Sequence, residues 1–123
     1  MNKNLVITSF LGALAIALGA FGAHSLKETL LIDELKNFET AVRYQMFHVI
    51  VLLVVNLYNG FDKKTKNILS SLFIAGIICF SGSIYAITIG VSAKNIWFVT
   101  PLGGLLFILG WMNLGWRFWK QKD

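Results

Sequence analysis

Charged residues are scarce in this chain of 123 residues. Lys, Arg, Asp and Glu make up 14% of the sequence, whereas a soluble globular domain contains about a quarter. The charges that are present fall in the gaps between four long apolar runs. The composition therefore predicts a single integral membrane domain over residues 1–123.

Cysteine and intramembrane acids are also nearly absent. The single cysteine, Cys79, excludes an internal disulfide and, because it lies in an apolar run, is interpreted as a packing residue. No Asp or Glu lies inside an apolar run, so a carboxylate-driven proton-coupled exporter would lack its working residue. Phosphate-binding-loop, zinc-protease and nucleophile-elbow motifs are missing too. We therefore expect no enzyme activity, no cofactor, no metal site and no nucleic-acid partner.

The apolar runs have the length that a helix needs to cross a membrane, about 20 residues. We place the spans at about residues 4–24, 42–60, 67–90 and 101–119. The first run exceeds the ~7–15 apolar residues of a signal peptide, which favours a retained span over a cleaved one. The predicted fold is an all-α membrane protein, a four-transmembrane-helix bundle that is multi-pass in the cell membrane.

Local signals suggest where the helices begin. Ser25 and Glu28 have capping-box spacing, which predicts a short interfacial helix from about Leu26 to Leu31, between the first two spans. Asp33 is the expected N-cap of a long helix that continues without Pro or Gly into the second span. Thr100, followed by Pro101, is the expected cap of the fourth helix.

The basic residues predict an orientation. Four spans put both termini on one side, and the positive-inside rule favours that side as cytoplasmic. Seven basic residues would then lie inside, namely Lys3, Lys63, Lys64, Lys66, Arg117, Lys120 and Lys122. Four would lie outside beside four acids, namely Lys27, Lys36, Arg43 and Lys94.

With this topology, every helix contributes polar side chains to the outer half of the bundle. These side chains belong to His24, Tyr44, Gln45, His48, Ser81, Ser83, Tyr85 and Thr100. The inner half is expected to be almost purely apolar, apart from Asn56, Asn59, Ser70, Ser71 and Asn113.

Two interpretations of the outer cluster stay open. It is either an interhelical hydrogen-bond network that fixes helix register, or a pocket that binds a lipid headgroup, a small solute or a cofactor. His48 stands out because a buried imidazole can titrate or ligate. A haem held jointly with His24 is disfavoured, because the two residues differ in depth by about 9 Å.

Small residues mark the expected helix-packing surfaces. Glycine and alanine recur at helical spacing in the first span, and glycine, serine and alanine do so in the third, which should contact neighbours on both sides. The glycines assigned to packing are Gly12, Gly19, Gly22, Gly76, Gly82, Gly103 and Gly104.

Four motifs in order resemble a known family. They are Gly19-Ala-Phe-Gly-Ala-His24, Phe38-x-Thr40-Ala41-x-x-Tyr44-Gln45-x-x-His48, Phe80-Ser-Gly-Ser-Ile-Tyr85, and Thr100-Pro-Leu-Gly-Gly104 with Gly110-Trp111. The family is that of domain of unknown function 423, related to the eukaryotic transmembrane protein 256. The resemblance covers nearly the whole chain and implies a four-helix cell-membrane protein without assigned activity. The bulky Ile96-Trp97-Phe98 departs from the small residues expected before Thr100.

Three functional hypotheses follow from these features. The first is a non-enzymatic membrane protein whose helical bundle interacts with lipid or with partner proteins. The second is an oligomeric permease for a small solute or ion that uses the outer polar cluster. The third is a redox component that binds a cofactor through His24 or His48.

Overall fold

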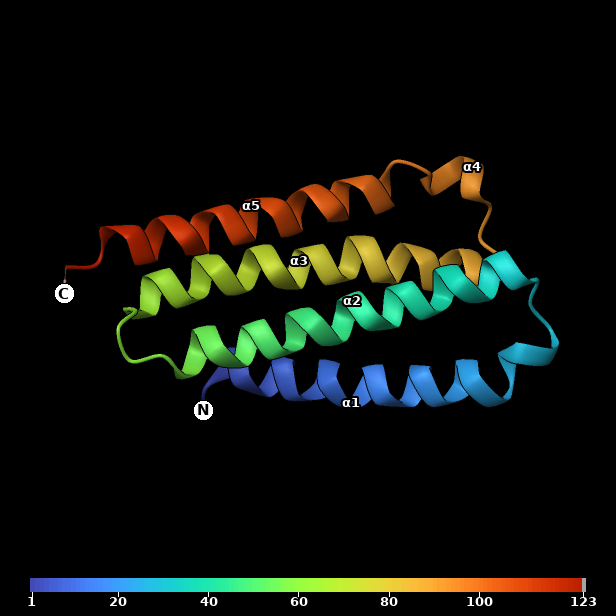
Figure 1. The fold of residues 1–123 in the computed structure, drawn as a ribbon, viewed down its shortest axis with the longest axis horizontal. Coiled ribbons are helices and arrows are strands. Elements are labelled where there is room, and N and C mark those ends of the chain that lie inside the picture. Colours follow the sequence, from blue (N-terminus) through green and yellow to red (C-terminus); the bar gives the residue numbers. More distant parts are fainter. Residues whose placement is uncertain (123) are drawn as a thin grey trace.

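The computed structural model describes residues 1–122 and is built from helices (Figure 1). The four long helices are α1 (Lys3–His24), α2 (Ile32–Leu57), α3 (Lys63–Thr88) and α5 (Val99–Lys120). A 3₁₀ turn, η1 (Leu26–Glu28), follows α1, and a short helix, α4 (Ala93–Ile96), precedes α5. The all-α prediction is confirmed.

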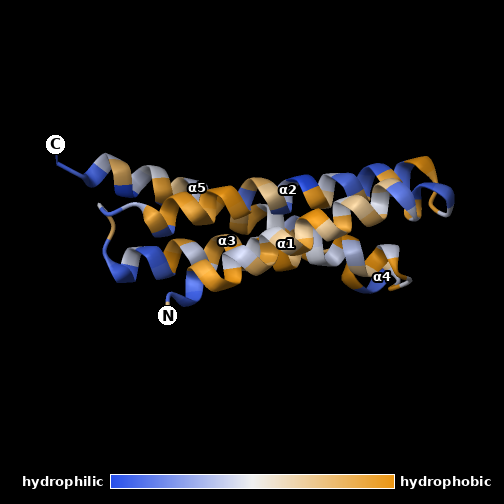
Figure 2. Cartoon of the chain, turned by 90° about the horizontal axis from the view of Figure 1, so that it is seen from below, coloured by the Kyte–Doolittle hydropathy of each residue, from blue (hydrophilic) through white to orange (hydrophobic). Residues whose placement is uncertain are grey.

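All four long helices are long and apolar enough to cross a membrane. Figure 2 shows hydrophobic residues along their middles and hydrophilic residues toward their ends. Both termini and the α2–α3 link lie at one end of the bundle, which we call the terminal end. The α1–α2 and α3–α5 links lie at the opposite end, which we call the connection end.

The helices pack in chain order. Extensive contacts join α1 to α2, α2 to α3, and α3 to α5 (Figure 1). The main core lies between α2, α3 and α5, where Leu52, Leu69 and Phe73 are fully buried. α2 and α3 are therefore the central helices, as predicted for the third span, and α1 and α5 flank them.

Glycines allow α3 and α5 to approach each other closely. A Cβ atom on Gly110 would lie 2.7 Å from the Phe73 ring, and one on Gly103 would lie 2.7 Å from the Phe80 Cα atom. Gly76 likewise faces the ring of Phe107. The Phe73 and Phe107 rings thus occupy the space that Gly110 and Gly76 leave, and Gly103 lets the backbone of α3 at Phe80 approach α5, because any side chain there would push the helices apart.

The α1–α2 contact uses the predicted small face of α1. Gly12 lies against Val49, Gly19 against Val42, and Gly22 against the Phe38 ring. Gly82 and Gly104 were predicted to lie at helix-packing surfaces, and the structure does not place them there. Within the described residues, no atom of a neighbouring helix lies within 4 Å of a Cβ placed on either glycine.

Several helix boundaries differ from those expected. α2 begins at Ile32, so Asp33 lies in its first turn, where its charge favours the helix dipole, and not at the cap. α5 begins at Val99, so Thr100 is already inside the helix. The interfacial helix is a 3₁₀ turn of three residues, and the Ser25 side chain makes no capping bond to it.

The sequence did not predict the N-cap of α3, which is Asp62. α3 starts at Lys63 and not at about residue 67. Asp62 accepts a hydrogen bond from the backbone N–H of Thr65 at 2.9 Å. Hydrogen bonds from the Thr65 side chain and then from its backbone N–H hold the pKa of Asp62 below its ordinary value. The carboxylate is therefore favoured at the start of α3.

Candidate functional site

Gln45 connects three helices at the centre of the predicted outer polar cluster. Its side chain is buried, its Nε2 donates to the Leu11 carbonyl of α1 at 2.8 Å, and its Oε1 accepts from the Tyr85 hydroxyl of α3 at 2.7 Å. The amide therefore uses both its donor and its acceptor between helices, which fixes the relative heights of α1, α2 and α3.

Serines extend this arrangement to the remaining helix pairs. The fully buried Ser81 donates its hydroxyl to the Ala41 carbonyl of α2 at 2.6 Å. The Ser83 and Thr100 hydroxyls are hydrogen-bonded to each other and join α3 to α5. We call the set Gln45, His48, Ser81, Ser83, Tyr85 and Thr100 the polar layer.

His48 has a partner at each ring nitrogen. Its Nδ1 lies 2.7 Å from the Tyr44 carbonyl, and its Nε2 lies 3.1 Å from Nε1 of Trp111 on α5. An indole N–H can only donate, so Nε2 must accept and the proton must sit on Nδ1. The ring also stacks on Phe107, with centroids 3.7 Å apart. This geometry describes a neutral imidazole enclosed by aromatic rings.

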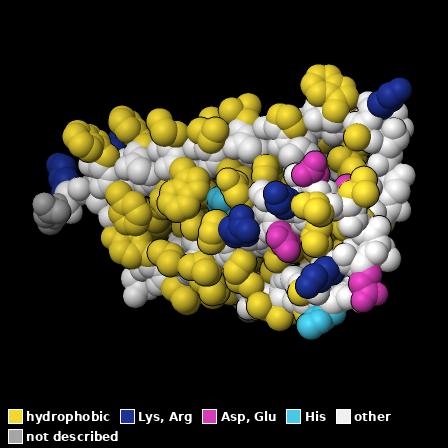
Figure 3. Space-filling model, turned by 45° about the vertical axis from the view of Figure 1, so that its right-hand side comes forward, with side chains coloured by type: hydrophobic (Ala, Val, Ile, Leu, Met, Phe, Trp, Pro, Cys, Tyr) yellow, Lys and Arg dark blue, Asp and Glu magenta, His cyan; other side chains and the backbone are white. Residues whose placement is uncertain are grey.

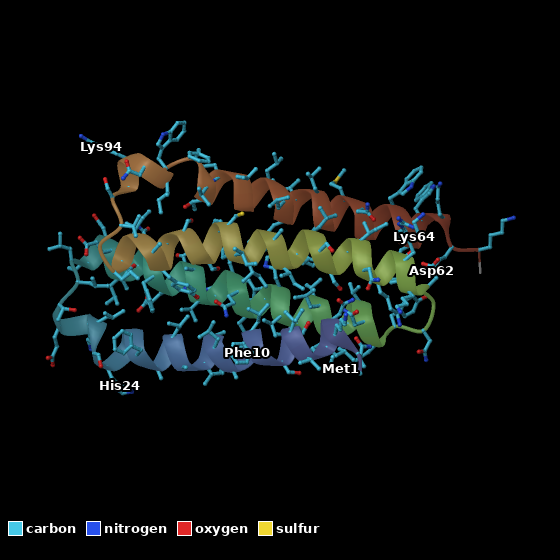
Figure 4. All side chains as sticks on the ribbon, turned by 180° about the vertical axis from the view of Figure 1, so that it is seen from behind. Met1, Phe10, His24, Asp62, Lys64 and Lys94 are labelled. Atoms are coloured by element: carbon cyan, nitrogen blue, oxygen red, sulfur yellow. The ribbon has the colours of Figure 1, made fainter. Side chains whose placement is uncertain are left out.

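The side chains of Tyr44 and His24 do not take part in these hydrogen bonds, although the Tyr44 carbonyl is bonded to His48. The Tyr44 ring stacks on Phe80 with a centroid distance of 4.8 Å, so it contributes an aromatic contact. His24 is exposed at the last residue of α1, at the connection end (Figure 4). The structure therefore does not bring the two histidines together.

The polar layer is closed on itself. Within residues 1–122, every buried side-chain nitrogen and oxygen has a hydrogen-bond partner. A small cavity of about 170 Å³ near the connection end lies between α1 and α2 and is lined by other residues, among them Gly19, Gly22, Glu39 and Arg43. On the face seen in Figure 3, charged side chains gather toward this end and apolar ones cover most of the rest.

The terminal end contains a larger pocket, of about 820 Å³, that the sequence reading missed. Residues of α1, α2 and α3 line it, together with the segment before α1. They are Met1, Asn2, Lys3, Asn4, Asn56, Lys63, Lys66, Asn67 and Ser71. We call this the amide pocket, because four of its residues are asparagines.

Asn56 of α2 forms the floor of the amide pocket and is 4% exposed. Its Oδ1 accepts from Asn4 of α1 at 3.0 Å, and its Nδ2 donates to the Ser70 hydroxyl of α3 at 2.8 Å. Asn4 also donates to Asn67 at 3.0 Å, and the Lys66 ammonium donates to the Asn56 carbonyl at 3.0 Å. The terminal end is therefore more polar than the almost purely apolar composition that the sequence predicted for it.

A second set of contacts fastens the end of α5 to the α2–α3 link. Arg117 donates to Thr65 at 3.0 Å and to Asn113 at 3.3 Å. Gln121 accepts from the Tyr58 hydroxyl at 2.8 Å and donates to the Gly60 carbonyl at 2.9 Å. These bonds hold the terminal end of α5 without adding a residue to the lining of the amide pocket.

Comparison with known proteins supports a membrane family without an assigned function. The model of a family described as "Protein of unknown function (DUF423)" matches residues 18–104. A "UPF0382 membrane protein" of Haemophilus influenzae is 40% identical over 122 residues, 99% of this chain and 98% of that protein. No solved structure matches.

Two further relatives extend the comparison. The Staphylococcus aureus "UPF0382 membrane protein SAB0533" is 39% identical over 93% of each chain. The "UPF0382 inner membrane protein YgdD" of Escherichia coli strain K12 is 37% identical over 87% of this chain and 82% of that protein.

Proposed function

The chain belongs to this DUF423 family of membrane proteins, and we propose that it is a non-enzymatic lipid-binding protein whose open side, along α1 and α3, receives a bilayer lipid. In this proposal the polar layer, which extends from the middle of the bundle toward the connection end, fastens the helices. The terminal end supplies the binding surface.

The observation that carries the proposal is an apolar groove on α3. It runs along one face of α3, is open on its outer side, and is formed by residues of that helix alone, namely Lys63, Lys64, Asn67, Ile68, Ser71 and Leu72. The groove is available because α1 packs along α2, while α3 packs along α2 and α5. An acyl chain is the expected occupant, since lipid surrounds this flank of the bundle in a membrane.

The polar layer supports a fastening role more than transport or redox chemistry. Gln45, Ser81 and His48 each spend their polar atoms on bonds to other parts of the bundle. Each such interhelical bond stabilises the bundle by about 0.6 kcal/mol in membranes, so several together fix the register of the helices. The permease and cofactor hypotheses would require these groups to exchange partners.

The proposed orientation places the terminal end in the cytoplasmic leaflet. Seven basic residues belong to that end, and Figure 4 shows Met1, Asp62 and Lys64 there, opposite His24 and Lys94. An excess of Lys and Arg near the ends of spans favours the cytoplasmic side.

Native mass spectrometry of protein extracted in mild detergent tests the lipid-binding function. We expect one or more phospholipids to remain bound to the wild-type chain. Ile68→Trp together with Leu72→Trp should fill the groove and lower this retention. Ile78→Trp, at an exposed position of α3 outside the groove, is the matched control and should have no effect.

Two results would contradict the proposal. Equal lipid retention by the groove variant and the control would place the lipid elsewhere. Conversion of added phospholipid into a new product by the purified protein would show that it is an enzyme.

A further inference from the structure

The amide pocket adjoins the apolar groove directly. Lys63, Asn67 and Ser71 line both, so one continuous surface passes from polar to apolar along α3. The larger part carries asparagine and lysine side chains, and the smaller part exposes mostly apolar atoms. A molecule that fills both parts must itself have a polar end and an apolar end.

The polar part has three lysines among its lining residues. Lys3, Lys63 and Lys66 line the amide pocket, and no acid occurs among its lining residues within the described chain. Asp62, the neighbouring acid, accepts a hydrogen bond from Thr65, and its charge interacts with Arg117 and Lys64, neither of which lines the amide pocket. Three ammonium groups around one recess favour an anion of more than one oxygen, such as a phosphate.

The asparagines supply donors for the same anion. Asn67 accepts the bond from Asn4 with its oxygen, which leaves its N–H groups for a ligand. Lys66 uses one of its three N–H donors on the Asn56 carbonyl and keeps two. Asn56, buried and bonded to both α1 and α3, holds these groups in place.

We propose that the amide pocket binds the phosphate of an anionic phospholipid, with Lys3, Lys63 and Lys66 around the phosphate oxygens and an acyl chain in the adjoining groove. This inference rests on the proposed lipid-binding function and adds the headgroup chemistry. It selects an anionic phospholipid over a zwitterionic one, whose choline would meet the lysines.

Native mass spectrometry with defined ligands tests the assignment. Full-length protein is titrated separately with phosphatidylglycerol, phosphatidylcholine and inorganic phosphate. We expect phosphatidylglycerol to bind most tightly. Lys63→Gln with Lys66→Gln should weaken it about 30-fold, since each lysine near an anionic lipid contributes roughly a factor of 5.

Matched variants distinguish the effect of the pocket lysines from the effect of the protein's overall net charge. Lys27→Gln with Lys94→Gln removes the same two charges outside the pocket and should leave phosphatidylglycerol affinity unchanged. Lys63→Arg with Lys66→Arg should retain binding. Thermal melting of each variant in the same detergent shows whether the fold is intact.

Distinct results would overturn distinct claims. Equal affinity for the two lipids, with no effect of the Lys63 and Lys66 substitutions, would overturn the headgroup assignment and leave lipid binding standing. If inorganic phosphate binds tightly and phosphatidylglycerol does not bind, the claim that the bound phosphate belongs to a lipid would be overturned. Failure of every lipid to bind would overturn the proposed function as well.

Discussion

The two ends of the bundle use the same kinds of side chain for different purposes. Near the middle of α2, on the side of the polar layer, Gln45 bonds to α1 and α3 and its side chain is buried. At the terminal end, Asn56 also bonds to α1 and α3, but it forms the floor of a pocket of about 820 Å³. Each amide sits on α2 and connects the same three helices.

The difference between the ends comes from what surrounds each amide. Around Gln45 the neighbours are helix backbone and aromatic side chains, which fill space and complete the bonds. Around Asn56 the neighbours include Lys3, Lys63 and Lys66, whose charges repel one another and favour an open, wetted site. A buried amide thus joins helices within packed surroundings in one case and lines an open pocket in the other.

The largest effect on the closed end should come from Gly103→Ala. The new methyl group would lie within 2.7 Å of the Phe80 Cα atom, so the backbones of α3 and α5 must separate and strain the Ser83–Thr100 bond. Overpacking of this kind costs about 1–3 kcal/mol. Thermal unfolding in detergent measures the loss, and Gly104→Ala, where a Cβ meets open space, should change stability by less than about 0.5 kcal/mol.

The same chemical change at both ends sharpens the comparison. Gln45→Leu should cost about 1–3 kcal/mol, because the Tyr85 hydroxyl loses its partner within packed surroundings. Asn4→Leu should cost nearer 1 kcal/mol, from two interhelical bonds of about 0.6 kcal/mol each, because Asn56 keeps its bond to Ser70 and Asn67 can reach water in the pocket. Equal losses in thermal unfolding would contradict the distinction between the ends.

A smaller effect is expected from Trp111→Phe. This substitution keeps an aromatic ring beside His48 and removes the N–H that donates to Nε2. One interhelical bond is lost, at about 0.6 kcal/mol. Trp116→Phe, on the same helix but away from His48, is the control for general loss of indole area. A destabilisation by Trp116→Phe as large as that by Trp111→Phe would show that the bond to His48 contributes nothing.

The smallest effect concerns pH at the terminal end. The folded-state pKa of Asp62 is lowered, so its stabilising effect is present above the unfolded value of about 3.9 and is lost as pH falls through the folded value. Melting temperatures of the wild type should therefore decline more steeply in this acid range than those of Asp62→Asn. Asparagine also caps helices but does not titrate. Parallel pH profiles for the two proteins would refute this role.

The sequence predicted much of the fold because apolar run length constrains membrane helices strongly. The four long helices, the central place of α3 and the contacts of Gly12, Gly76 and Gly103 could all be anticipated from apolar runs and small residues. Counting residues along each predicted helix also placed Gln45 and Tyr85 in the same half of the bundle, and the structure joins them by a hydrogen bond. Caps were less predictable, because Leu31 and Phe98 precede α2 and α5 without any side-chain capping bond.

The amide pocket escaped prediction for a physical reason. Asn4 and Asn67 fall at the starts of apolar runs, where polar residues are ordinary and carry no signal of contact. Their significance arises from the packing order of the helices, which brings both toward Asn56. Hydropathy does not encode that order. Pairing Asn56 with Ser70, two polar residues that are buried toward the terminal end, would have given the best clue.

The central claim is that the terminal end is open to water and the connection end is closed. Thiol labelling of detergent-permeabilised membrane vesicles, in which the reagent reaches both membrane faces, tests it most directly, with Ser71→Cys, Ser81→Cys and Ile78→Cys each placed in a Cys79→Ser background. Ser71 lines the amide pocket, Ser81 is fully buried in the polar layer, and Ile78 faces lipid. A charged maleimide should label Ser71→Cys and leave the other two unreacted, because thiolates form in water and not in lipid or a packed interior. Labelling of Ser81→Cys as fast as Ser71→Cys, or of Ser71→Cys no faster than Ile78→Cys, would contradict the account.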